Sequence, residues 1–579
     1  MMKQWPIARQ AYTQGVVFLV CILELSAQDT VRLSEVEVQS LPSFHASSLG
    51  NKSNVDFSSP GMTSLWSASG FSLRTTGPNA SVLFGLSGMP SAYTQTLWMG
   101  FPINSPTLGT YDFSFALSGQ PTTRWDVYTG AESAYLGSGS AGGVVDVTPS
   151  SPLVDEPLSF VLSSLGNATL RFPWRHGPAS QSVLSLWNTP NAFRYTDYLG
   201  VLRKRIGADS RGLSHHWMGQ WGHRSAALWV VGSHMGLPES ASSAYRLGAR
   251  QGDVQVRGTL AQKSQWKGWE TQWSQLMTME YQKYVSVPIQ DTHTTLGWKM
   301  QGVTEKNWKQ WSVHSSVGSG YVGAFGPSHD LLWIREDFAK MAVQKKSGWG
   351  TLGLWARHDQ RVYHQSLHSS PMQGGVHVQR RQQWRVSIAR HFRFPTLNDL
   401  AWKPGGNPAL LPERGTILDG TALLYAHPSV RIRTGFKATS LLESIVWLPQ
   451  GNRWRPVNSG KLRSMAWETG MDWKIRRWSG QAKYTYVAST WIFSIPHRLW
   501  ADVQYSRGKW KVEVQGIGQS STPLIAKPIL SIHLGVEYQG KHATWRGEMD
   551  NALGIENEWI PYYPQPKFNP SITCKIPIQ

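Results

Sequence analysis

Polar and apolar residues alternate along many short stretches in the second half of the chain. The clearest stretch is 531–538, SIHLGVEY, in which every second residue is apolar and the intervening residues are polar or glycine. The same alternation occupies 471–475, 481–486, 501–505 and 509–515. A period of two puts alternate side chains on opposite faces of a strand. The pattern therefore predicts a series of β-strands, each with one apolar face and one polar face.

Tight connections join these strands. Ser506-Arg507-Gly508 separates two of them and predicts a hairpin turn. Amphipathic strands build either a soluble sandwich, where apolar faces pack together, or a membrane barrel, where apolar faces meet lipid and polar faces line the lumen. Full charges recur on the polar faces, and aromatic residues recur near strand ends. Both features favour the barrel, because a wet lumen accepts charge and aromatic residues gather at membrane interfaces.

Composition removes several other classes of protein. Of 579 residues, 16% are charged, 30 are Trp and two are Cys. A disordered chain does not carry so many Trp, and two Cys cannot form a disulfide scaffold. After residue 27, no apolar run approaches the roughly 18 residues that a membrane-spanning helix needs. We also find no repeat of about 40–50 residues, which counts against a propeller.

The N-terminus has the layout of a secretory signal peptide. Lys3 and Arg9 precede an apolar stretch over 15–25, and small residues at 26–27 offer a cleavage site. This arrangement predicts export with removal of residues 1–27. The alternative is a buried helix.

Charge divides the remaining chain into two parts. Residues 28–150 contain four basic and eight acidic residues, whereas 151–579 carries a net charge of +23. The first part is dense in Gly, Ser, Pro and Thr, and the apolar run at 143–147 predicts its last strand. We therefore expect a domain boundary near residue 150, with a compact domain over 41–150.

Two segments of the first part resemble the plug domain of TonB-dependent outer-membrane receptors. They are 94–109, TQTLWMGFPINSPTLG, and 135–147, YLGSGSAGGVVDV. Matches to the same family follow in order at 392–413, 447–464 and 551–567. The sequence of the first segment is most similar to that of the vitamin B12 receptor branch of Bacteroidetes.

The resemblance implies an all-β membrane protein. Residues 151–579 would form a 22-stranded transmembrane β-barrel, with a small N-terminal α/β plug domain, 41–150, inside it. Three features depart from the family pattern. Gly88-Met89-Pro90 stands where the family usually has an Arg-Gly pair, Lys567-Phe568 replaces Gly-Arg, and the chain ends without an aromatic residue.

The resemblance also implies a function: energised uptake of a scarce large ligand across the outer membrane, most closely a cobalamin-type corrinoid. The partners implied are TonB with its inner-membrane energising complex, and outer-membrane lipid and lipopolysaccharide. Whether a surface lipoprotein caps the barrel is left open. The segment 28–40 would hold the TonB box, whose alternating residues suit addition to a partner's sheet edge. The box residues are Leu33, Ser34, Glu35, Val36, Glu37 and Val38. The alternative is an ordinary first strand of the plug.

The expected ligand site lies between the barrel's outer loops and the plug's apical loops, because these polar, Gly- and Pro-rich turns join plug strands. The residues expected to contact the ligand are Ser87, Met89, Ser91, Tyr93, Phe101, Asn104, Ser105 and Thr107.

The charge of +23 leaves the ligand open. It suits contact with anionic lipopolysaccharide, or a lumen and outer loops that attract an anionic ligand. An anionic ligand fits a ferric siderophore better than a corrinoid, so a siderophore or haem receptor of the same architecture is the first alternative. A secreted Trp-rich adhesin that binds glycans is the second. A passive porin has no use for a plug. We expect no nucleic-acid partner, because the chain is exported.

Motifs for enzyme chemistry are weak. Residues 137–142 satisfy G-x-G-x-x-G, but the Gly-Val-Val-Asp-Val that follows cannot open a good helix, so we expect a glycine turn in the plug. His215 and His216 are adjacent, and on a strand they would point to opposite faces. No metal-ligand cluster, nucleophile elbow or P-loop motif is present. We expect no enzyme activity, no metal site and no cofactor.

Overall fold

The computed structural model describes residues 52–56, 71–77, 80–119, 124–149, 156–197, 199–241, 248–287, 289–363, 366–380, 383–403, 405–451, 453–525 and 527–577. Three expectations fall outside these residues and stay predictions. They are the signal peptide at 1–27, the TonB box at 33–38 and the domain boundary at residue 150.

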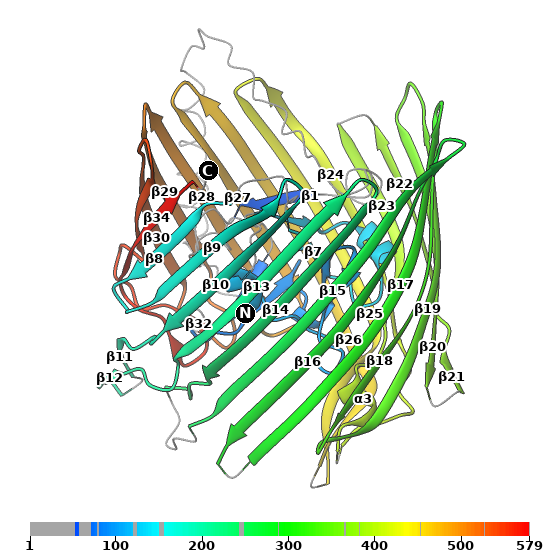
Figure 1. Cartoon of the computed structure of the whole chain (residues 1–579), viewed down its shortest axis with the longest axis horizontal. Coiled ribbons are helices and arrows are strands. Elements are labelled where there is room, and N and C mark those ends of the chain that lie inside the picture. The colour runs from blue at the N-terminus through cyan, green and yellow to red at the C-terminus, as the bar shows by residue number, and fades with distance from the viewer. Residues whose placement is uncertain are drawn as a thin grey trace, which may run out of the picture.

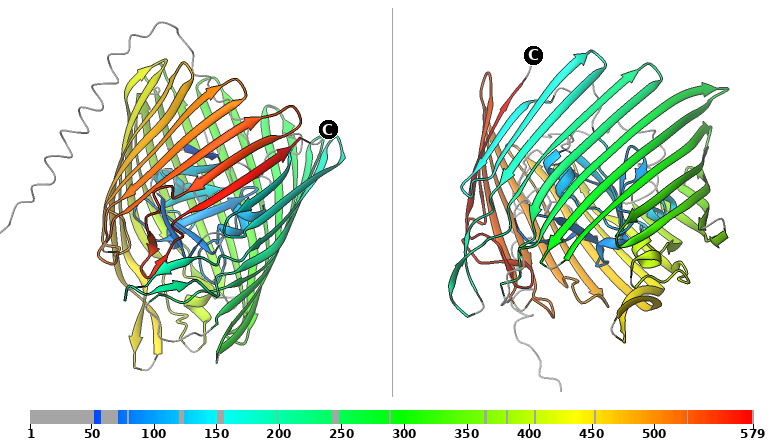
Figure 2. Two further views of the ribbon diagram at one scale, coloured as in Figure 1. Left: turned by 90° about the vertical axis from the view of Figure 1, so that its left-hand side faces the viewer. Right: turned by 60° about the horizontal axis from the view of Figure 1, so that its bottom comes forward.

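The first part of the chain folds into a small α/β plug inside a barrel (Figures 1 and 2). Its main sheet has the order β1-β6-β7-β4-β5 among the described residues, and only β4 and β7 run parallel. A separate two-stranded sheet pairs β2 with β3. The plug elements are β1 (Lys52–Asp56), β2 (Phe71–Thr75), β3 (Val82–Leu86), η2 (Ser91–Tyr93), β4 (Thr94–Trp98), β5 (Phe101–Pro102), α2 (Ser114–Gly119), β6 (Arg124–Tyr128), η3 (Ala131–Leu136) and β7 (Gly143–Asp146).

The second part closes into an antiparallel barrel. β21 and β22 both pair with β20 and form one interrupted strand, so the described residues make 22 barrel strands, as expected. The barrel strands are β8 (Leu158–Ser163), β9 (Ala168–Gly177), β10 (Ser180–Thr189), β13 (Ser210–Trp221), β14 (Arg224–Gly236), β15 (Arg250–Trp266), β16 (Trp269–Ser286), β17 (Ile289–Trp308), β18 (Trp311–Gly326), β19 (His329–Lys346), β20 (Thr351–Tyr363), β21 (Ser366–Ser369), β22 (Met372–Arg380), β23 (Trp384–Arg393), β24 (Glu413–His427), β25 (Val430–Gln450), β26 (Arg453–Ile475), β27 (Trp478–Ser489), β28 (His497–Arg507), β29 (Trp510–Gln519), β30 (Ile529–Gln539), β31 (Thr544–Asp550) and β34 (Asn569–Ile576).

The two ends of the barrel differ in their connections. Most connections at one end have two residues, as at 267–268 and 309–310, and we call this end the turn end. The other end, the loop end, carries the longest connections, including 190–209, 394–412 and 551–568. The loops hold the short elements β11 (Arg194–Thr196), β12 (Leu202–Lys204), α3 (Leu397–Ala401), β32 (Glu558–Ile560) and β33 (Tyr563–Pro564). The loop end lies at the bottom of Figure 1, where α3 and β11 are labelled. In outer-membrane barrels the short turns face the periplasm.

The last strand closes the barrel without a terminal aromatic residue. β34 pairs with β31 on one side and with β8 on the other, where Ile576 lies opposite Leu158. Closure leaves no unpaired edge along this seam, which is the condition for strands in a lipid environment.

Apolar side chains point out of the barrel and polar ones point in. On β30 the outward residues Leu530, Leu534 and Val536 are 40–47% exposed, whereas Ser531 and His533 are almost fully buried. This is the reverse of a soluble sandwich, where the apolar face would be buried. The strands predicted from the alternation are confirmed, and their apolar faces form a surface suited to lipid.

No helix among the described residues is long and apolar enough to cross a membrane.

Candidate functional site

A cavity of about 260 Å³ lies between the plug and one side of the barrel wall. The plug side comes from loop 99–109 and from the glycine turn at 137–139. The wall side comes from β16–β20 and β23, and loop residues 394–397 close the cavity near the loop end. The volume is near the lower limit of the range of roughly 300–1,000 Å³ that small-molecule sites occupy.

Asn104 holds the plug loop in shape. Its Nδ2 donates to the carbonyl oxygens of Thr94 at 2.9 Å and Gly109 at 3.0 Å, and its Oδ1 accepts from the amide of Thr96 at 2.7 Å. Gly109 has a φ of +71° and closes the loop by donating to the carbonyl of Ser105 at 2.8 Å. One amide side chain thus satisfies three backbone groups that a loop would otherwise leave without partners.

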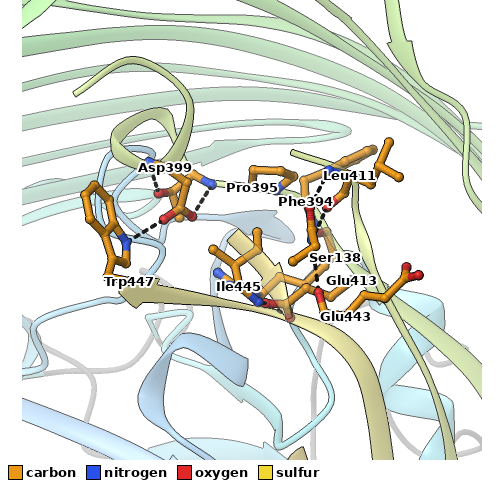
Figure 3. Close-up of polar contacts among 12 residues, drawn as sticks. Ser138, Phe394, Pro395, Asp399, Leu411, Glu413, Glu443, Ile445 and Trp447 are labelled. Atoms are coloured by element: carbon orange, nitrogen blue, oxygen red, sulfur yellow. Dashed lines mark hydrogen bonds and ion pairs between the residues drawn. The ribbon is translucent and has the colours of Figure 1, made fainter. Parts of the chain in front are cut away.

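The plug loop touches an outer loop of the barrel. The amide of Leu397, at the start of α3, donates to the carbonyl of Pro106 at 2.9 Å. α3 has a capping box, in which Thr396 and Asp399 satisfy each other's backbone amides, and Trp447 on β25 donates to Asp399 at 3.0 Å. Figure 3 shows this chain of contacts from α3 to the long hairpin β25–β26. The loop end and the plug are therefore mechanically connected at the cavity.

The glycine-rich segment forms a turn, as expected, and it lines the cavity. Gly137 and Gly139 have φ values of +143° and +78°, conformations that favour glycine. Phe394 donates its amide to Ser138 Oγ at 2.9 Å, and Gly139 donates to the carbonyl of Phe392 at 3.2 Å. The turn connects η3 to β7 and joins the plug to the outer loop (Figure 3).

Most charges that line the cavity are paired. Arg357 forms a two-pronged ion pair with Asp359 at 2.7 and 2.8 Å, and Arg361 pairs with Glu336. Arg361 also lies 4.1 Å from the ring centroid of Phe394. Such paired charges position loops and side chains but leave little net field.

Two lysines facing the cavity differ from these arginines. Lys299 on β17 and Lys340 on β19 have no carboxylate within 4 Å among the described residues. Lys340 is 9% exposed, and its Nζ lies 4.5 Å from the ring centroid of Tyr135. A lysine without a direct anionic partner makes this side of the cavity favourable for an anion, because a bound anion would stabilise the charged form of the side chain.

The residues predicted to contact the ligand fall into two groups. Phe101, Asn104 and Ser105 line the cavity. Thr107 is buried beside them, with its hydroxyl 2.9 Å from that of Ser105. The structure thus brings this group together beside the wall, although the polar atoms of Asn104 form hydrogen bonds with the plug backbone.

The second group lies against another part of the wall. Ser87 and Met89 are buried, and the carbonyl of Ser87 accepts from Ser464 Oγ of β26 at 2.7 Å. Ser91 is half-buried in η2, and Tyr93 is buried with Arg393 5.2 Å from its ring centroid. Burial raises the pKa of Tyr93, so the phenol stays neutral.

Sequence reasoning did not find the residues on the barrel side of the cavity. Lys299, Lys340, Arg357 and Arg361 sit on inward positions of ordinary alternating strands. Their sequence signal, a cation on the polar face of a strand, is shared by many other barrel residues. Only the strand order shows which of these cations face one cavity.

Neither a family model nor a curated protein matches this sequence. Solved structures do match. The siderophore receptor PirA from Acinetobacter baumannii is 13% identical with a TM-score of 0.72, and the match covers 91% of this chain and 98% of that one. The copper transporter OprC is 12% identical with a TM-score of 0.73, over 91% and 98%. The FrpB iron transporter from Neisseria meningitidis is 11% identical with a TM-score of 0.73, over 90% and 97%.

At these identities the matches establish the fold, and each of the three names a receptor or transporter rather than an enzyme. The matches span nearly the whole of both chains, so the plug and the barrel are shared together. The chain thus shares the fold of these receptors and transporters, a 22-stranded barrel with an N-terminal plug.

Proposed function

We propose that this protein is an outer-membrane uptake receptor that binds a scarce metal complex and releases it inward when the plug moves. The observation that carries the proposal is the plug itself, which occupies the lumen and shares a cavity with the wall near the loop end. A permanently open pore would gain nothing from such a domain. A gated receptor needs both a closed lumen and a site where ligand binding can reach the plug.

The ligand class that fits the cavity best is an anionic iron or other metal chelate. Lys299 and Lys340 supply positive charge there without a direct carboxylate partner. The names of the similar structures, a siderophore receptor, an iron transporter and a copper transporter, support the same class. The cavity would hold the charged centre of such a complex, and the outer loops would cover the remainder.

A corrinoid is the second candidate. It rests on segment 94–109, whose resemblance is to the vitamin B12 receptor branch, and this segment forms the loop that lines the cavity. Like the chelate, a corrinoid would extend beyond the cavity, but it carries little net charge, so its binding would not depend on the two lysines.

Energy coupling would use the segment at 33–38. Leu33–Val38 would pair as an added strand with TonB, and force derived from the inner-membrane proton gradient would displace the plug. The contacts of the plug loop with α3 supply a route by which ligand at the loop end could change how the plug is held.

The first experiment is equilibrium binding to the detergent-purified protein of a panel of ferric siderophores and of cyanocobalamin. We expect a ferric siderophore to bind below about 1 µM, equivalent to about −8 kcal/mol, with an affinity that falls as salt rises. The double variant Lys299→Met/Lys340→Met should bind it at least about tenfold more weakly. Lys527→Met, at an exposed loop position, is the matched control.

The outcomes separate the candidates. Tight cobalamin binding whose affinity does not change with salt or in the double lysine variant would show that the ligand is a corrinoid and not a metal chelate. Failure of every ligand in a protein that keeps its heat-modifiable gel mobility would contradict the receptor proposal. Deletion of 33–38 tests coupling, because it should abolish ligand-dependent growth while leaving binding unchanged.

A further inference from the structure

Most of the barrel's positive charge lies at the turn end. Counting each connection between described strands with three residues on either side, the ten turn-end connections contain 19 Lys and Arg against 2 Asp and Glu. The eleven loop-end connections, counted in the same way, contain 16 against 11. The turn end therefore carries +17 of the +23 on 151–579, and the cavity and outer loops account for little of it.

Tryptophan is concentrated at the same end. The same windows contain 11 Trp at the turn end and 5 at the loop end. Apart from Trp349, which lies in a turn, each of the turn-end Trp falls in the alternation of the outward-facing apolar residues of its strand. Eight of them are exposed by 36–69% of their surface, namely Trp221, Trp266, Trp308, Trp311, Trp349, Trp478, Trp510 and Trp545. Outward Trp at strand ends marks the depth at which lipid headgroups begin.

Three of the turn-end cations lie against Trp rings. Lys267 Nζ lies 4.8 Å from the ring centroid of Trp266, Lys306 Nζ lies 5.3 Å from that of Trp269, and Lys345 Nζ lies 5.2 Å from that of Trp311. Lys306 Nζ also donates to the carbonyl of Lys267 at 3.2 Å. Cation–π contacts favour positions of the ammonium groups close to the level of the rings.

We propose that the turn end binds the anionic headgroups of glycerophospholipids in the leaflet that it meets. The Trp rings would lie among the upper acyl chains and glycerol groups, and the adjacent cations would contact lipid phosphates. The five lysines on the connections from β15 to β20, which are Lys267, Lys306, Lys309, Lys345 and Lys346, form one continuous stretch of this surface. Each cation close to an anionic membrane surface favours binding by a similar increment, so a stretch of five gives a measurable lipid preference.

This surface faces away from the lumen and is therefore distinct from any site for a transported ligand. The Trp that hold the cations are on the lipid face of the wall, whereas the cavity is on the lumen face. The inference therefore does not depend on the substrate.

The test uses the full-length protein in phosphatidylcholine bilayers. Brominated phosphatidylglycerol and brominated phosphatidylcholine each quench Trp fluorescence on contact, and the ratio of their relative binding constants measures the preference. We expect the wild-type protein to prefer phosphatidylglycerol by about fivefold or more, and the preference to fall as salt rises.

Two matched variants locate the effect. The variant Lys267→Gln/Lys306→Gln/Lys309→Gln/Lys345→Gln/Lys346→Gln should bring the ratio to within about twofold of unity. The variant Arg194→Gln/Lys204→Gln/Arg453→Gln/Arg455→Gln/Lys527→Gln removes five exposed loop-end cations and should leave the ratio unchanged. Heat-modifiable gel mobility confirms that both variants form barrels.

Two results would overturn the proposal. Equal quenching of the wild-type protein by both lipids would mean that the turn end does not select anionic lipid, and an acidic periplasmic protein would become the better partner for these cations. Equal losses in both variants would mean that net charge, and not the turn-end surface, sets the preference.

Discussion

The plug meets the two sides of the barrel through different chemistry. Toward β13, β14 and β16 the contact is apolar and aromatic, with Trp98 packed near Trp229 and His216 and a cluster that extends through Phe84, Phe113 and Trp125. Toward β20–β26 a smaller apolar cluster, which includes Tyr135 and Trp355, is joined by many polar contacts. There the η3 region meets arginine, aspartate and lysine side chains of the wall.

The polar side is built on single, directional contacts. Glu132 is 1% exposed, pairs with Arg385 of β23 and accepts from Ser387 at 3.1 Å. Asp419 of β24 accepts from the amide of Ala131 at 2.5 Å, and Lys437 of β25 donates to the carbonyl of Gly142 at 2.7 Å. The free energy of apolar contacts changes gradually when the packed surfaces shift. Directional polar contacts of this kind require one relative position and are lost together when it changes. The polar side therefore fixes where the plug sits, and the cavity lies beside it.

The apolar side should give the largest single loss of plug stability. Trp98→Ala removes a fully buried indole, and we expect the free energy that holds the plug in place to fall by about 3–5 kcal/mol. The measurement is the urea concentration at which large ion conductance appears in a planar bilayer. Leu108→Ala, at a half-exposed position in the same domain, is the control. An unchanged midpoint for Trp98→Ala would show that the apolar side does not hold the plug.

A substitution on the polar side should cause the second-largest loss of plug stability. Glu132→Gln keeps the shape of the side chain but removes the direct ion-pair partner of buried Arg385 and leaves Asp419 as its nearby carboxylate, and we expect a loss of about 3 kcal/mol in the same assay. The matched control is Glu132→Gln/Arg385→Gln, which removes both charges and should recover a large part of the loss. No recovery in the double variant would mean that the ion pair is not the source of the effect.

The comparison of the two sides also shows what sequence could supply. Alternation along stretches such as 509–515 and 531–538 predicted barrel strands, because period two depends only on which residues are apolar. The glycine turn before β7 was predictable for a similar local reason, since Gly137 and Gly139 need no distant partner to require their conformations.

Contacts between distant residues were not predictable. Glu132 and Arg385 are 253 positions apart, and nothing local marks either as a partner of the other. The predicted ligand residues were chosen as polar loop residues, and the structure shows that Asn104 and Ser87 use their polar groups within the protein. The Trp-Lys-Gly-Trp at 266–269 and Trp-Lys-Gln-Trp at 308–311 were visible in the sequence, but their meaning depends on knowing that both turns lie at the same end of the barrel.

A smaller effect should follow from a change in the plug loop that lines the cavity. Asn104→Ala removes three hydrogen bonds that shape 103–109, and we expect a local loss of about 2 kcal/mol. Hydrogen exchange of this loop should accelerate, and ligand affinity should fall with it. Ser105→Ala removes one hydroxyl contact and should change exchange little. Faster exchange without any loss of affinity would place the ligand away from this loop.

The smallest predicted effect concerns Asp112, the buried acid on the apolar side, in contrast to Glu132, the ion-paired acid on the polar side. Asp112 lies in the plug beside Phe113, and its Oδ1 accepts from the amides of Val82 and Ser114 at 2.9 Å each. Burial raises the pKa of this carboxyl above its ordinary value of 3.8, and the backbone hydrogen bonds oppose the shift only in part. The folded plug therefore binds a proton more readily at this site than the unfolded chain does.

The sign of the pH dependence follows from that difference. Between pH 3.8 and the raised pKa the folded state holds more protons, so plug stability falls as pH rises through this window, by less than about 1.4 kcal/mol per pH unit. Asp112→Asn keeps a carbonyl oxygen for both amides and has no proton to lose, so its urea midpoint should be flatter across the same window. A wild-type midpoint that instead rises with pH here, with the slope removed by Asp112→Asn, would mean that the two amides outweigh burial and that Asp112 is held as an anion even on the apolar side.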